Sequence, residues 1–157
     1  YRRTIIHELT HVVQGLLLGT VHPSFVDEWV SEGLAEYISG GSQYPPVLNL
    51  NRMNQLTSTY GELNPIAQHI GDDYTPDVGS KYYYPMYGLA VRYLTDHVGL
   101  NNPLSTFRDL FLELRGNAPC YVGGVCPEFE MAFNARMGID LDEYEARFFE
   151  IIRAYLN

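Results

Sequence analysis

His7-Glu8-Leu9-Thr10-His11 is the stretch around which the rest of the chain is organised, and it lies in an amphipathic segment predicted to be helical from Arg2 to Leu18. On a helix, positions i and i+4 share one face about one turn apart, so His7 and His11 can hold a single metal ion. Glu8 lies on the flank of that face, where it can reach a water molecule at the metal. Two neutral imidazoles suit zinc, and a catalytic zinc site takes a third protein ligand and keeps one position open.

The composition is that of one globular domain. The chain has 157 residues, of which 46% are apolar and 18% are charged. The net charge is -9 with a single lysine, which argues against nucleic-acid backbones and anionic membranes as partners. No apolar run approaches the roughly 20 residues that span a bilayer. The absence of an initiator methionine before Tyr1 indicates a mature product, a fragment or a trimmed domain.

Two cysteines bear on the compartment in which the protein works. Cys120 and Cys126 enclose a short flexible loop, Tyr-Val-Gly-Gly-Val. A disulfide between them is the leading interpretation, with free thiols as the alternative, since no second cysteine pair or nearby histidine favours a metal site. Together with the acidic, lysine-poor composition, this pair favours a secreted or otherwise extracytoplasmic protein.

Helices dominate the predicted structure, which has no convincing strand, and the fold class is mainly α. Gly19 is predicted to stop the first helix, Ser24 to cap a second over about residues 25–38, and Asp140 to cap a single last helix. We divide the single domain into zinc-binding helices (1–40), an irregular segment forming one wall of a cleft (41–80) and a helical C-terminal subdomain (81–157). Further helices are predicted at about 50–60, 65–70, 85–97, 103–115 and 127–137.

A third metal ligand is predicted on the second helix, in the run Trp29-Val30-Ser31-Glu32-Gly33-Leu34-Ala35-Glu36-Tyr37. A connector of a few residues makes this helix an antiparallel neighbour of the first. Glu32 lies near its middle, where a carboxylate can meet the two imidazoles, and Gly33 would let these two helices approach closely. The competing interpretation of Glu32 is an ordinary solvated helix face.

The two motifs together resemble the gluzincin zinc peptidases, whose second zinc helix carries Trp-x-x-Glu-Gly-Leu-Ala-Glu-Tyr. Bacterial collagenases and leukotriene-hydrolase-type aminopeptidases are more distantly similar. The resemblance implies that His7, His11 and Glu32 are zinc ligands and that Glu8 is the general base. It also implies a zincin-like catalytic domain, of which this chain holds the helical part. A β-sheet would precede the first helix, outside this sequence.

Two further site residues are candidates. A ligating histidine usually donates its other N–H to a carboxylate, and Glu36, one turn after Glu32, is the candidate for that role; a plain surface glutamate is the alternative, and Glu28 is a weaker candidate. By resemblance, the helix that follows the zinc helices begins with a tyrosine pointing at the metal, which here is Tyr84. Its phenol would stabilise the oxyanion. Tyr87, or simple packing, is the alternative.

The other histidines and a cluster of aspartates are not expected to bind metal. We do not expect His22, His69 or His97 to bind the metal. Asp72, Asp73 and Asp77 offer oxygen ligands for calcium, but solvated turns of this composition are common and are favoured here.

The function predicted from the sequence is hydrolysis of a peptide bond in a peptide or protein substrate, with one Zn²⁺ as cofactor. A non-catalytic zinc-stabilised domain that binds peptides or glycans is one alternative, and it would have no need of Glu8. A zinc hydrolase of a non-peptide amide is the other. The sequence does not distinguish an exopeptidase from an endopeptidase.

Overall fold

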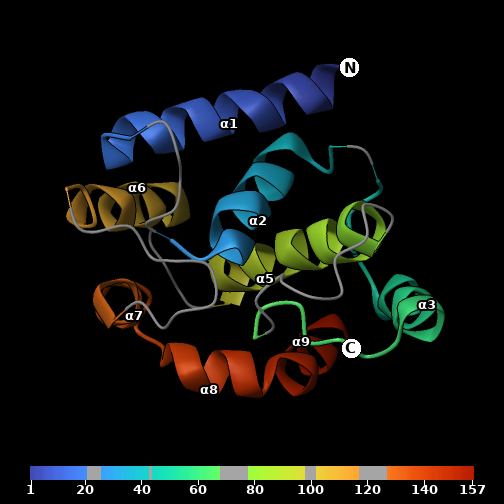
Figure 1. Ribbon diagram of the computed structural model, residues 1–157. Coiled ribbons are helices and arrows are strands. Elements are labelled where there is room, and N and C mark those ends of the chain that lie inside the picture. Colours follow the sequence, from blue (N-terminus) through green and yellow to red (C-terminus); the bar gives the residue numbers. More distant parts are fainter. Residues whose placement is uncertain (21–25, 43, 68–77, 98–101, 117–126) are drawn as a thin grey trace.

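The computed structural model describes residues 1–20, 26–42, 44–67, 78–97, 102–116 and 127–157, and this part of the chain is mainly helical with no strand. Figure 1 shows the arrangement. In chain order, the elements are α1 (Arg2–Leu18), α2 (Glu28–Ser39), α3 (Leu50–Tyr60), the π-helix η1 (Gly79–Tyr83), α5 (Tyr84–His97), α6 (Pro103–Glu113), α7 (Pro127–Met137), α8 (Leu141–Ala146) and α9 (Phe148–Leu156).

The first helix has the bounds predicted from the sequence. It ends at Gly19, which has a φ of 75° and whose N–H bonds to the carbonyl of Gly15. Glycine enters this left-handed region without a Cβ penalty, which is why it stops the helix cleanly. In Figure 1, α1 lies along one side of the molecule and packs on α2 and α6.

The packing of α2 against α5 is the most extensive between any two described elements. A Cβ built at Gly33 would lie 2.5 Å from the carbonyl oxygen of Tyr87 and 2.8 Å from a methyl group of Val91. The prediction that Gly33 permits a close helix approach therefore needs a correction, because the partner that approaches it is α5 and not α1. The missing Cβ lets the backbone of α5 lie directly on α2 beside Glu32.

Several predicted helices differ from the structure. The described part of the helix predicted at about 65–70, residues 65–67, forms a turn. The second helix begins at Glu28, and Asp27 takes the N-cap position without a side-chain hydrogen bond; Ser24, the expected cap, lies outside the described residues. The predicted single last helix is two helices, α8 and α9, which meet at Arg147 with φ −106° and ψ 15°. Asp140 does cap α8, since its side chain accepts from the N–H of Glu143.

The core lies between α2, α5 and the later helices, and α1 covers only part of it. The outer face of α1 is apolar and exposed, and it is formed by Ile5, Leu9, Val12, Val13 and Leu16, which are 53–70% exposed. No helix in the described ranges combines the length and the apolarity that crossing a bilayer requires.

Candidate metal centre

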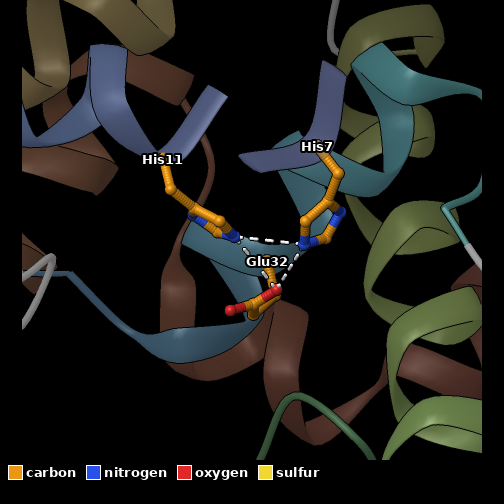
Figure 2. A group of neighbouring side chains, drawn as sticks. All are labelled: His7, His11 and Glu32. Carbon is orange, nitrogen blue, oxygen red and sulfur yellow. Dashed lines mark hydrogen bonds and ion pairs between the residues drawn. The ribbon is translucent and has the colours of Figure 1, made fainter. Parts of the chain in front are cut away.

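Three side chains from two helices converge at one point between α1 and α2. Figure 2 shows His7 and His11 reaching from α1 toward Glu32 on α2. The Nε2 atom of His7 lies 3.1 Å from Oε2 of Glu32 and 3.1 Å from Nε2 of His11. The Nε2 atom of His11 lies 3.3 Å from the same carboxylate oxygen. In the described part of the chain, these three residues form the group of histidine, cysteine or acidic side chains that could hold a metal ion.

The spacing of these atoms fits a zinc ion. Ligands about 2.0–2.1 Å from zinc in a tetrahedron lie about 3.3–3.4 Å apart from one another. The observed separations of 3.1 to 3.3 Å are within a few tenths of an ångström of that edge. Two imidazole nitrogens and one carboxylate oxygen are also the donor set of a catalytic zinc site with one position left open.

The opposite ring nitrogen of each histidine faces an acceptor. Nδ1 of His7 lies 3.0 Å from Oε1 of Glu36, a close ion-pair contact that is poorly aligned for a hydrogen bond. Nδ1 of His11 lies 2.8 Å from Oε1 of Gln14. A neutral imidazole with an acceptor at Nδ1 carries its proton there and directs the lone pair of Nε2 away. When both rings are neutral, both Nε2 lone pairs therefore point toward Glu32.

Glu36 lies beside the His7 ring, on the side away from Glu32. It is 4% exposed, and one carboxylate oxygen accepts the N–H of Ser42 at 3.0 Å. The Ser42 hydroxyl donates to the other oxygen. A buried carboxylate held by these donors is fixed in orientation, and it is not the plain surface glutamate that was the alternative.

Gln14 is the site residue that the sequence did not reveal. A glutamine three positions after a metal-ligating histidine lies on the same helix face, and this spacing is the signal that could have identified it. Its side chain is buried between α1 and α2, where its amide nitrogen donates to the carbonyl of Ser31 at 2.8 Å.

The charges at the site stabilise one another. Burial lowers the pKa of His7, but contacts with Glu32 and Glu36 outweigh it and raise the pKa to about 9. A hydrogen bond from the His11 ring to the Glu32 carboxylate raises the pKa of His11. Burial raises the pKa of Glu32, yet the two histidines outweigh that effect and lower it to about 2. The carboxylate is thus ionised across the working pH range, as a metal ligand requires.

The other predicted site residues lie around this centre. Glu8 is an exposed residue of α1, and Glu28 is exposed at the start of α2. The Tyr84 ring packs against the His7 ring with centroids 6.2 Å apart and planes at 27°. Tyr87 is buried, 1% exposed, with its ring beside those of Tyr83 and Tyr84.

Several predicted features fall elsewhere. His97 is exposed at the end of α5, where its ring packs on Tyr93 and Tyr155. The remaining residues weighed from the sequence lie outside the described residues: His22, His69, Asp72, Asp73, Asp77, Cys120 and Cys126. The calcium, disulfide and free-thiol interpretations therefore stay predictions.

Comparisons with protein-family models, with curated proteins and with solved structures find no match to this chain. The functional argument therefore depends on the geometry of the site.

Proposed function

We propose that His7, His11 and Glu32 bind one Zn²⁺ and that the site hydrolyses peptide bonds in the manner of a gluzincin. The observation that carries this proposal is the convergence of three electron-pair donors, each within 3.3 Å of the other two. With both imidazoles neutral and both Nδ1 atoms facing acceptors, the two Nε2 lone pairs and the carboxylate converge on one point, where a divalent cation would take the place of the protons that the two histidines otherwise hold.

The roles of the residues follow from where they lie. Zinc in such a site supplies Lewis-acid polarisation of a carbonyl and brings the pKa of water to about 7. Glu8, next to His7 in sequence and exposed, accepts a proton from the attacking water and delivers it to the departing amine. The Tyr84 phenol, on a ring packed against His7, donates to the oxyanion. His7 and His11 are held by Glu36 and Gln14.

The zincin-like part of the proposal concerns the outer face of α1. Five apolar side chains on that face are more than half exposed, and large contiguous apolar surfaces of this kind mark interaction sites. A β-sheet covering this face would bury them and leave the metal face of α1 open to substrate on the Glu8 side. The exposed apolar face of α1 therefore supports the zincin-like architecture that the sequence resemblance implies.

Glu8→Gln tests the proposal. Because Glu8 is no metal ligand, this variant should bind zinc as the parent does, while hydrolysis of a panel of quenched peptides falls at least 100-fold. Glu128→Gln is the matched control, since Glu128 is exposed at the start of α7, outside the site, and should leave turnover unchanged.

The outcomes separate the alternatives. Turnover that persists in Glu8→Gln would remove the general-base role. Zinc binding by the parent with no peptide cleavage would favour the non-catalytic binding domain or a non-peptide substrate. Cleavage that a chelator fails to stop would refute the zinc mechanism.

A further inference from the structure

Gln14 connects the two zinc helices through a single amide. It is 1% exposed on the face of α1 that packs against α2. Its Oε1 lies 2.8 Å from Nδ1 of His11, and its Nε2 donates to the backbone carbonyl of Ser31 at 2.8 Å. Ser31 immediately precedes Glu32 in the sequence, so the same side chain contacts one ligand directly and the backbone beside another.

The carbonyl of Ser31 determines which way the amide faces. A backbone carbonyl only accepts hydrogen bonds, so the amide nitrogen of Gln14 must point to it. The amide oxygen then faces His11, and an oxygen that only accepts requires Nδ1 of His11 to carry the proton. The neutral ring is left with a bare Nε2 on the side of Glu32.

We propose that Gln14 is a positioning residue that fixes the tautomer and the ring orientation of His11. The inference rests on the proposed metal site and deepens it, because only the Nδ1–H tautomer presents the Nε2 lone pair to a metal. A buried amide with both of its groups hydrogen-bonded has little freedom to turn, so the ring orientation is set before a metal binds.

The neutrality of Gln14 also sets the charge of the site. Glu32 and Glu36 together contribute two negative charges, which match one divalent cation. His7 faces a carboxylate and His11 faces an amide, so the two histidines are held by acceptors of different charge. A glutamate at position 14 would be a third carboxylate. It would still offer an acceptor to His11, but it would add a buried charge and lose the hydrogen bond that is donated to the carbonyl of Ser31.

The experiment compares two variants with a control by competitive zinc titration against a chromophoric chelator. Gln14→Met keeps the unbranched shape and removes both hydrogen bonds, and we expect its zinc affinity to fall 10- to 100-fold. Gln14→Glu keeps an acceptor for His11 and should bind zinc more tightly than Gln14→Met. Thr57→Val removes a buried hydroxyl on α3, which donates to the carbonyl of Asn54 in its own helix, and should leave affinity unchanged.

The tautomer of His11 can also be measured directly by NMR in the parent protein, which requires no variant to fold. In the metal-free parent at alkaline pH, long-range ¹H–¹⁵N correlations of the imidazole rings should show His11 protonated at Nδ1 and bare at Nε2. In Gln14→Met this preference should be lost. The opposite tautomer in the parent, zinc affinity of Gln14→Met within about twofold of the parent, or Gln14→Glu as weak as Gln14→Met would each overturn the proposal.

The two proposals fail in different ways. A parent protein that binds no zinc refutes the proposed function, whereas the tautomer of His11 in the metal-free protein still decides the role of Gln14.

Discussion

Gly33→Ala is the substitution that tests most directly how the fold places Glu32. The added Cβ would lie 2.5 Å from the Tyr87 carbonyl oxygen, while ordinary contact begins at 3.4 Å. Relieving that overlap requires α2 and α5 to separate by about 1 Å, because the atom that is met belongs to the backbone and cannot turn aside. Glu32 is the adjacent residue, so the same movement shifts a proposed metal ligand.

The expected cost is the balance of two opposed effects. Overpacking a filled interface costs about 1–3 kcal/mol. Alanine regains about 1 kcal/mol relative to glycine inside a helix. Because this contact involves backbone on both sides, we place the overpacking term at the upper end of its range. The net destabilisation is then about 1–2 kcal/mol, or roughly 2–8 °C in Tm for a domain of this size.

Urea unfolding followed by tryptophan fluorescence measures this effect. Trp29 is the single tryptophan of the chain and is buried on α2 itself, so its emission reports on the relevant helix. Gly88→Ala is the matched control on α5, because its Cβ would lie 3.1 Å from the Cβ of Glu36 and no closer than 3.9 Å to the backbone of α2. Gly88→Ala should lower the free energy of unfolding by less than Gly33→Ala does. A Gly33→Ala protein more stable than the parent would show that helix propensity dominates and would refute the close-approach argument.

Three further predictions concern Glu36 and Tyr84 beside His7, and Glu145 on α8. Glu36→Gln removes the charge that faces His7 and should weaken zinc binding 10- to 100-fold in a chelator competition; unchanged affinity would leave Glu36 a structural role only. Tyr84→Phe keeps the ring that packs on His7 and should lower kcat about 100-fold without changing zinc affinity, and an unaltered kcat would exclude the phenol from the reaction. Burial raises the pKa of Glu145 from 4.5 to about 7, so the unfolded chain releases this proton first and stability should fall as the pH rises from 4.5 through 7. The full shift would be worth about 3 kcal/mol, which solvent screening of this partly exposed carboxyl reduces to about 1 kcal/mol. Glu145→Gln should flatten that dependence in urea titrations across the range; an unchanged slope would contradict the shift.

Local signals in the sequence were enough to predict most of the helices. The bounds of α1 follow from an amphipathic run ended by a glycine, and α7 follows from a proline at its start and a glycine after its end. The meeting of His7, His11 and Glu32 could be predicted because helix periodicity places the first two, and a short connector restricts where the third can lie. These are short-range constraints, which a single sequence carries explicitly.

The features that could not be predicted depend on contacts between distant segments. The partner of Gly33 is a carbonyl 54 residues further along the chain, in α5, and nothing near Gly33 identifies it. The break at Arg147 has no proline or glycine to announce it. Gln14 was missed because glutamine on a helix is ordinary in composition. Its spacing three residues after His11 was the available signal, but the orientation of its amide by the carbonyl of Ser31 depends on the packing of α2.

These contacts also explain why the His-Glu-x-x-His motif alone is not a metal site. The two histidines share a face of α1, but each ring is oriented by α2, through Glu36 at His7 and through Ser31 and Gln14 at His11. The position of α2 is in turn set by the backbone of α5 at Gly33. The proposed metal site therefore depends on the packing of α1 on α2 and of α2 on α5. Damage to the α2–α5 interface should consequently weaken metal binding as well as stability, even though no residue of α5 supplies a ligand atom.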